Sequence, residues 1–316
     1  MHGSVLVTGG FGNLGSWITK YLLEKNFKVY VLTRSKAKSS VSNLMSPNLH
    51  IVEADITDRS LLAEKLDFDL DFCIHAASYN EFYEDDYPSK ALLVNSLGTR
   101  NILDVLSKKN LKHFVYLSTF HVYGVTSGYI SELTPTIPIN DYASTHLFGE
   151  YYVRQFGLTS NLKFSILRLT NSYGAPFTID TDKWYLILND LTRSAFESGN
   201  VVLKSNGQIQ KDFIYMGDVV DSIYKLLLVE PKNEIFNISY GRSKTLLGLA
   251  QTVKRVFRDS FSKDIDIIVN SSDEVDYENL VVSNDKLAKF IDFKPRDYID
   301  NEIVSIINLL EDSVKS

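Results

Sequence analysis

The sequence predicts an α/β protein built on a doubly wound parallel sheet, with a smaller α/β lobe towards the C-terminus. Short apolar runs rich in β-branched residues alternate with segments of helical periodicity through the first half of the chain. Strands that alternate with helices form parallel sheets, because each helix carries the chain back to the edge where the next strand begins. The first strand is followed by a glycine-rich turn and a helix, a unit typical of this architecture.

Six strands are predicted from short apolar runs, at 4–8, 28–33, 50–53, 71–75, 113–118 and 163–169. The spacing of apolar residues predicts helices at 14–25, 60–66, 90–108 and 142–156. The regular alternation ends after residue 169. We expect residues 1–171 to form the main domain and residues 211–240 to return to it, because that segment contains an apolar strand, a helix and a second strand. Residues 172–210 and 241–316 would form the smaller lobe.

The turn after the first strand passes directly into a helix and is rich in glycine. Its residues are Gly9, Gly10, Phe11, Gly12, Asn13, Leu14 and Gly15. Glycine lets the backbone approach a pyrophosphate closely, and the helix N-terminus offers free N–H groups and the positive end of its dipole. The sequence therefore predicts a Rossmann-type dinucleotide site formed by Gly9, Gly12, Asn13, Leu14 and Gly15.

Composition narrows the class of protein. A net charge of −6 argues against nucleic-acid binding, which needs a surplus of basic side chains. The absence of a run of 18 apolar residues, and of a leader before the first strand, predicts a cytoplasmic protein that is not associated with a membrane. The single cysteine, Cys73, excludes an internal disulfide and a thiolate metal cluster, and no metal is expected.

Seven short motifs follow one another along nearly the whole chain. They lie at 8–15, 55–56, 75–77, 94–101, 117–124, 167–174 and 211–219. In this order they resemble the extended short-chain dehydrogenase/reductases, the family of nucleotide-sugar epimerases, dehydratases and reductases. The resemblance implies that Asp55 and Ile56 contact the adenine, that Ala76 and Ala77 lie along the cofactor, and that Asn95 belongs to the cofactor site. It also implies that the smaller lobe binds the substrate.

The end of the second strand bears on the choice between NAD and NADP. An acidic residue about twenty positions after the glycine turn binds the ribose hydroxyls of NAD. Here the strand ends with Arg34, Ser35 and Lys36, and no carboxylate is present. A guanidinium offers a planar fork that suits a 2′-phosphate. We therefore predict NADP(H) rather than NAD; the alternative is that these charges belong to a solvated loop.

The resemblance implies that a tyrosine phenol exchanges a proton with the substrate while hydride moves to or from the nicotinamide. The family carries a lysine four residues later, which lowers the pKa of the phenol and holds the ribose. Tyr142 stands at the tyrosine position, but His146 replaces the lysine. His146 could act in its place, a displaced cation or a water could do so, or catalysis could be lost. Thr119 would hydrogen-bond the substrate oxygen.

Other positions restrict the reaction and its substrate. The 4,6-dehydratases of the family carry Asp-Glu where this chain has Phe120 and His121, so dehydratase activity is not expected. Trp184 and Tyr185 in the smaller lobe are expected to form the wall of a nucleobase pocket by stacking. The predicted substrate contacts are Asn171, Tyr173, Trp184 and Lys211.

We predict from these residues an NADP(H)-dependent reductase of a keto group on a nucleotide-linked sugar. Tyr142 would donate the proton, with His146 in place of the usual lysine. A nucleotide-sugar 4-epimerase and a catalytically silent nucleotide-binding subunit are the alternatives. By family analogy, the helices at 90–108 and 142–156 would pack against their copies in a homodimer.

Overall fold

The computed structural model describes residues 3–34, 44–81, 84–181, 183–270 and 278–315. Its main feature is a seven-stranded sheet in the order β11-β7-β5-β4-β1-β2-β3, in which all neighbours are parallel. The strands are β1 Ser4–Thr8, β2 Lys28–Thr33, β3 Leu49–Glu53, β4 Phe72–His75, β5 His113–Thr119, β7 Phe164–Leu169 and β11 Glu234–Ile238. The predicted doubly wound α/β fold is confirmed.

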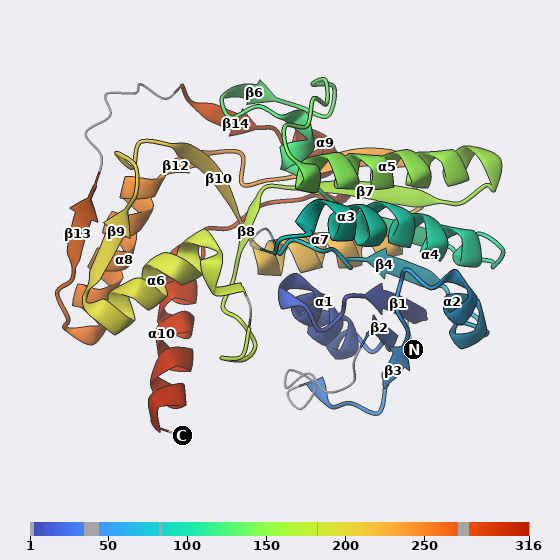
Figure 1. The fold of residues 1–316 in the computed structure, drawn as a ribbon, viewed down its shortest axis with the longest axis horizontal. Helices are drawn as coiled ribbons and strands as arrows, with labels where there is room; N and C mark the ends of the chain where they lie inside the picture. The colour runs from blue at the N-terminus through green and yellow to red at the C-terminus, as the bar shows by residue number, and fades with distance from the viewer. Residues whose placement is uncertain (1–2, 35–43, 82–83, 182, 271–277, 316) are drawn as a thin grey trace.

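Helices cover both faces of this sheet (Figure 1). On one face lie α1 (Asn13–Glu24), which buries Ile18 and Leu22 against the strands, and α7 (Met216–Leu228), which buries Ile223 and Leu226. On the other lie α2 (Arg59–Lys65), α4 (Thr99–Leu106) and α5 (Asp141–Thr159). Full burial of one such apolar side chain stabilises the fold by about 1.5–3 kcal/mol, so each helix is held by its apolar face.

The strand order reverses between β1 and β4, because β2 and β3 extend the sheet to one side of β1 and β4, β5, β7 and β11 extend it to the other. In open parallel sheets the carboxyl ends of the strands leave a crevice at such a reversal, and ligands bind there. The glycine turn after β1 and the ends of β4 and β5 meet at this point.

The helix predicted at 90–108 has three parts. It begins as α3 (Tyr87–Ala91), continues as a π-helical segment (Leu92–Gly98) and ends as α4. The wider π turn lets two consecutive side chains, Asn95 and Ser96, both hydrogen-bond Thr145 of α5. Such π segments are often found at functional sites.

The segment at 211–240 divides between two sheets. Strand β10 (Gln210–Tyr215) lies between β8 (Asn171–Tyr173) and β12 (Ser243–Thr245) in a separate three-stranded sheet. Strand β11 then joins the main sheet beside β7. The chain therefore returns to the main sheet through β11, while β10 links the main sheet to the smaller lobe.

The smaller lobe has its own apolar core. It is formed by α6 (Ile187–Ser198), α8 (Leu246–Phe261) and α10 (Ile299–Lys315), with the paired strands β9 (Asn200–Leu203) and β13 (Asp266–Val269). The remaining elements are β6 (Gly128–Ile130), β14 (Leu280–Val282) and α9 (Asp285–Ile291). Helix α9 packs into the core of the main sheet, so the segment after α8 contributes to both parts.

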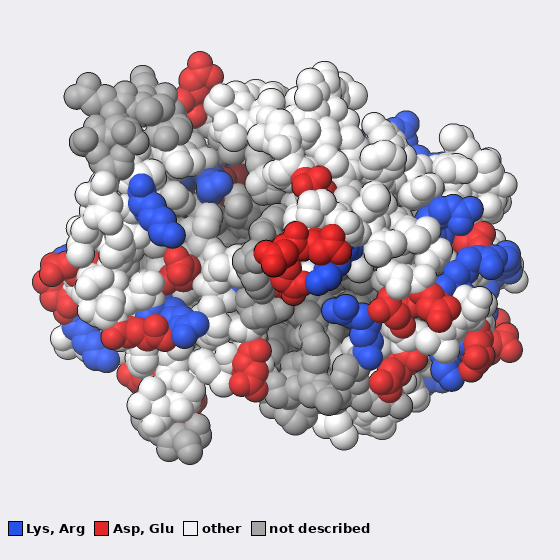
Figure 2. All heavy atoms as spheres, in the orientation of Figure 1, with Lys and Arg blue, Asp and Glu red and all other residues white. Residues whose placement is uncertain are grey.

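Acidic and basic side chains are interspersed on the face of the molecule seen in Figure 2. The surplus of negative charge is therefore spread over this face among basic groups. Among the described residues, no helix combines the length and the apolar character needed to span a membrane.

Candidate functional site

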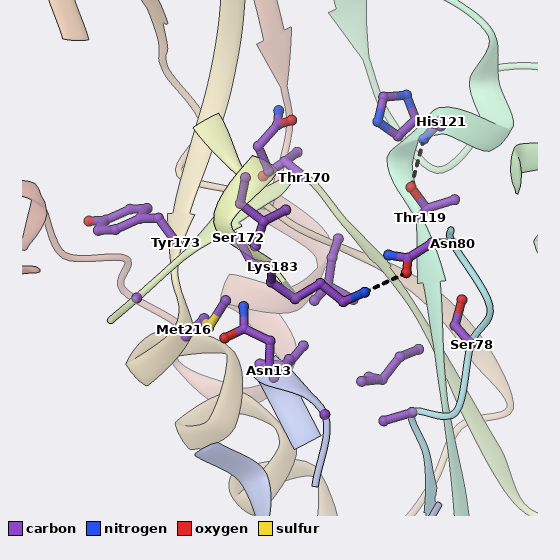
Figure 3. A pocket seen from close by; sticks show the side chains of 18 of the residues that line it. Asn13, Ser78, Asn80, Thr119, His121, Thr170, Ser172, Tyr173, Lys183 and Met216 are labelled. Atoms are coloured by element: carbon purple, nitrogen blue, oxygen red, sulfur yellow. Dashed lines mark hydrogen bonds between the residues drawn. The ribbon is translucent and has the colours of Figure 1, made fainter. Parts of the chain in front are cut away.

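A cavity of about 440 Å³ lies where the strand order reverses, between the main sheet and the smaller lobe (Figure 3). This volume is within the range of small-molecule and cofactor sites. Its wall combines the glycine turn, the loops after β4, β5 and β7, the start of α5, and the segment before α6. The two parts of the chain therefore each supply side chains to one site.

The glycine turn has the geometry of a pyrophosphate cradle. Gly9 has a φ of +67°, and a Cβ placed on Gly15 would lie 2.0 Å from the Gly9 carbonyl oxygen, so only glycine fits. Gly12 precedes α1 without a side-chain cap, which leaves the first N–H groups of the helix for an anion. Gly9, Gly12, Asn13, Leu14 and Gly15 all line the cavity. These residues fit the pyrophosphate of a dinucleotide.

The residues predicted to contact the adenosine lie away from this cavity wall. Arg34 is exposed at the end of β2, and Ser35 and Lys36 lie outside the described residues. The Asp55 carboxylate accepts hydrogen bonds from the N–H and the hydroxyl of Thr57, at 2.8 and 2.7 Å. Ile56 is buried against Gly98, the last residue of the π-helical segment.

The loop after β4 is held in place at both ends. The Thr8 hydroxyl accepts hydrogen bonds from the N–H groups of Ala76 and Ala77, at 3.2 and 3.1 Å. The buried Asn95 amide accepts from the Tyr79 N–H at 2.7 Å and donates to the Tyr79 carbonyl oxygen at 3.1 Å. Ala76 lines the cavity. Asn95 therefore acts on the site through the position of this loop.

Tyr142 and Thr119 meet in the cavity wall. Thr119 ends β5, and Tyr142 lies in the first turn of α5, which begins at the Asn140 cap. Both side chains line the cavity. Burial raises the pKa of Tyr142 to about 12, and the Thr119 side chain offsets part of this rise. The phenol is therefore protonated at neutral pH in this structure.

His146 lies one helical turn after Tyr142 and is buried in the same wall. Its Nδ1 donates to the Tyr142 carbonyl oxygen at 2.8 Å, which leaves Nε2 as the acceptor for the Ser78 hydroxyl at 3.3 Å. Burial lowers the pKa of His146 to about 4, so the ring is neutral at pH 7. A neutral imidazole supplies no positive charge to the phenol, whereas its Nε2 can accept a hydrogen bond from a hydroxyl.

The predicted substrate contacts divide between the cavity and its surroundings. Asn171 and Tyr173 line the cavity, but the Tyr173 hydroxyl accepts from the Tyr298 N–H at 2.9 Å within the smaller lobe. Lys211 lines a neighbouring pocket, together with Asn171 and His121. His121 also lines the main cavity and connects the two.

Trp184 is not among the described residues that line the cavity, and the stacking of its indole on a nucleobase stays a prediction. The indole Nε1 donates to the Ile179 carbonyl oxygen at 3.0 Å, and the Arg193 guanidinium lies 5.2 Å from the ring centre. These two contacts hold the ring against the surface of α6. Tyr185, the other residue expected at the nucleobase pocket, lines the cavity.

Several polar cavity residues were not singled out from the sequence, among them Ser78, Asn80 and Lys183. Ser78 and Asn80 follow β4, and their position after the end of a parallel strand was a usable signal. Lys183 lies in the short 3₁₀ turn Lys183–Tyr185 and reaches across to the Asn80 side chain (Figure 3). It stands in an irregular segment without a motif, so only the tertiary structure brings it to the site.

The chain is similar to known proteins over most of its length. The family model described as the NAD dependent epimerase/dehydratase family matches residues 5–239. A dTDP-L-rhamnose 4-epimerase of Burkholderia thailandensis is 26% identical over 290 residues, covering 79% of this chain and 80% of that protein. A UDP-glucose 4-epimerase of Lactobacillus helveticus is 25% identical over 309 residues, covering 92% of each.

Solved structures show the same fold. The UDP-glucose 4-epimerase of Thermotoga maritima, determined with UDP-glucose, superposes with a TM-score of 0.84 at 21% identity, covering 98% of this chain and 99% of that one. The family model spans the glycine turn, Thr119, Tyr142 and all seven strands of the main sheet. This protein therefore belongs to the NAD-dependent epimerase/dehydratase family.

Proposed function

We propose that this protein is a nucleotide-sugar 4-epimerase that uses a bound nicotinamide dinucleotide. The observation that carries the proposal is the placement of Tyr142 and Thr119 in one cavity with the glycine turn. A phenol and a hydroxyl beside a dinucleotide cradle suit proton transfer at a sugar hydroxyl that is oxidised and then reduced. The names of the relatives, which include 4-epimerases acting on UDP- and dTDP-linked sugars, support the proposal.

The side chains have separate tasks in the proposed reaction. A bound nicotinamide would supply the hydride acceptor and donor. Tyr142 acts as the phenolate, whose oxygen takes the proton from the sugar hydroxyl and later returns it. The Thr119 hydroxyl orients that sugar oxygen by hydrogen bonding. His146 is neutral and offers Nε2, together with the Ser78 hydroxyl, to a cofactor ribose hydroxyl.

The same wall disfavours elimination of water from the sugar. Phe120 is buried, and His121 follows it in the 3₁₀ turn Phe120–Tyr123, so no carboxylate stands at these two positions. Although part of His121 is exposed, desolvation of its ring lowers its pKa, so little of the protonated, proton-donating form is present at neutral pH. We therefore propose epimerisation without loss of a hydroxyl.

The test is conversion of defined substrates. Purified protein is incubated with UDP-glucose, UDP-N-acetylglucosamine and dTDP-glucose in the presence of NAD or NADP, and the products are identified by nuclear magnetic resonance. An epimerase converts one of these to its C4 epimer without net change in the cofactor. Cofactor binding without turnover of any sugar would identify a silent nucleotide-binding protein and reject the proposal.

Reduction of a keto sugar with NADPH is the second candidate, and Arg34 favours it. Arg34 stands at the end of β2, where an acidic residue would select NAD. A reductase consumes NADPH stoichiometrically, so 4-keto nucleotide sugars added to the same assay distinguish the two reactions by the amount of cofactor oxidised.

Replacing Arg34 with alanine is expected to weaken NADP binding and leave NAD binding nearly unchanged. A hydrogen bond to a charged group contributes about 1.5–3 kcal/mol, which corresponds to about a tenfold to hundredfold rise in the Kd for NADP. Isothermal titration with both cofactors measures the ratio of the two Kd values, and NAD serves as the internal control. An equal change for both cofactors would mean that Arg34 does not contact a 2′-phosphate.

We also propose a homodimer through the π-helical segment and α5. Leu92, Leu93 and Leu97 on the first element, and Phe148 and Tyr151 on the second, are exposed although apolar. The change Leu93→Glu is expected to convert a dimer into a monomer in light scattering, because it places a charge in the apolar contact. Leu133→Glu is the control, because Leu133 is 94% exposed outside both elements. A wild-type monomer, or equal effects of both changes, would refute this interface.

A further inference from the structure

The proposed function requires Tyr142 to lose and regain a proton near neutral pH, and its surroundings oppose ionisation. Burial raises the pKa of Tyr142 to about 12, and a nearby positive charge is the interaction that favours tyrosinate most directly. His146 cannot supply that charge, because its own pKa is lowered to about 4. A compensating charge has to reach the phenol from elsewhere in the cavity.

Lys183 is the only lysine or arginine among the described residues that line the cavity. Its ammonium donates to the Asn80 amide oxygen at 3.0 Å and pairs with the Glu81 carboxylate at 3.1 Å. The Lys183 side chain is only 14% exposed, and Figure 3 shows it extending across the cavity towards the wall that carries Thr119. These contacts hold a positive charge inside the site, where solvent screens it less than at the surface.

We infer that the Lys183 ammonium supplies the positive charge that stabilises the Tyr142 phenolate, in place of a cation on α5. The inference rests on the proposed function. Lys183 acts through Tyr142 and is therefore a positioning residue. Because Lys183 comes from the smaller lobe and Tyr142 from the main domain, the charge reaches the phenol only when the two parts are packed around the cavity.

Among the protein's own described groups around Tyr142, Lys183 is the side chain that can supply positive charge. The other charged and titratable groups are Asp141 and His146 on α5, His121 after β5, Tyr79 after β4, Tyr87 on α3, Tyr116 on β5, Tyr185 beside Lys183, and Glu81 as its partner. Besides burial and the Thr119 side chain, Tyr185 raises and Lys183 lowers the pKa of Tyr142. Desolvation lowers the pKa of both His121 and His146, so neither ring adds a charge at neutral pH.

The direct test is the pKa of Tyr142 in Lys183 variants. Tyrosinate absorbance is titrated for each protein, and the curve of the same protein carrying Tyr142→Phe is subtracted. Lys183→Gln is expected to raise the Tyr142 pKa by about one unit. A close opposite charge shifts a pKa by about one to three units, and Glu81 offsets part of the charge of Lys183, so we expect the lower end of this range. Lys183→Arg should keep the wild-type value. Lys204→Gln, which removes an exposed lysine after β9, is the matched control and should leave the pKa unchanged.

The pH profile of kcat/KM should move with this titration. Tyrosinate is the reactive form, so Lys183→Gln should shift the acidic limb to higher pH by the same amount and lower kcat/KM at neutral pH by about tenfold. Adding His146→Lys to Lys183→Gln places an ammonium one turn after Tyr142 on α5 and should restore both values. A change in KM alone, with the Tyr142 pKa unchanged, would show that Lys183 only holds the Asn80–Glu81 loop and would overturn the inference.

Two further outcomes keep this inference separate from the proposed function. Titration of Tyr142 needs no sugar, so a Lys183-dependent pKa in a protein without turnover would refute the epimerase and leave the electrostatic role standing. If circular dichroism shows that Lys183→Gln is unfolded, Glu81→Gln tests the same charge in the opposite direction. It keeps Lys183 and removes its counter-charge, so it should lower the Tyr142 pKa; no change would overturn the inference.

Discussion

Tyr142→Phe is expected to lower kcat by about 10²–10⁴-fold, the usual contribution of a positioned acid–base group. The change removes one oxygen atom and keeps the ring that packs beside His146, where the ring centres are 4.3 Å apart. The loss should therefore appear in kcat, while dinucleotide binding stays close to wild type. Initial rates with a sugar identified in the conversion assay, together with the Kd for the dinucleotide, measure the two effects.

Tyr129→Phe is the matched control for this prediction. Tyr129 lies on β6 with 63% of its surface exposed, and the substitution removes the same atom outside the cavity. Its kcat should equal the wild-type value. If Tyr142→Phe reduced kcat by less than about tenfold, the proton would have to pass through another group, and the mechanism proposed above would be rejected.

Glu150→Ala is expected to destabilise the protein by about 3–5 kcal/mol, because it leaves a buried guanidinium without its partner. The Glu150 and Arg168 side chains are 1% and 4% exposed, and two hydrogen bonds of 2.9 and 2.6 Å join them. The Ser118 hydroxyl also donates to Glu150, at 2.6 Å. Urea denaturation followed by circular dichroism measures the loss in the free energy of unfolding.

Two comparisons identify the cause of that loss. Glu197→Ala removes one partner of the exposed Arg193–Glu197 pair on α6 and should cost less than about 1 kcal/mol. The double change Glu150→Leu with Arg168→Met removes both buried charges and should be more stable than Glu150→Ala alone. The double variant buries no unpaired charge. If it were as unstable as Glu150→Ala, the loss of stability could not come from an unpaired Arg168.

The ion pair also affects the site, because Tyr142, His146 and Glu150 follow one another at intervals of four residues along α5. Residues at this spacing lie on the same face of a helix. Glu150 ties that face to β7 through Arg168 and to β5 through Ser118. We therefore expect Glu150→Ala to lower kcat as well, at temperatures where the protein remains folded.

Much of the fold could be predicted because its signals are local. The strands β1 and β2 begin and end at the predicted residues, and the other predicted strands of the main sheet differ by one residue at an end. The π-helical segment was not predicted, because it depends on side-chain hydrogen bonds from Asn95 and Ser96 to a helix about fifty residues later in the chain.

By itself, the sequence determined the order of strands and helices, the glycine turn, and the placement of Thr119 and Tyr142 at the ends of their elements. These features depend on residue spacing and backbone freedom, which neighbouring residues specify. Only the tertiary structure decided that His146 is neutral, that Trp184 is not among the residues lining the cavity, and that Lys183 reaches it. Burial and Coulomb interactions depend on which segments pack together through space, and that information is not present in any local stretch of the chain.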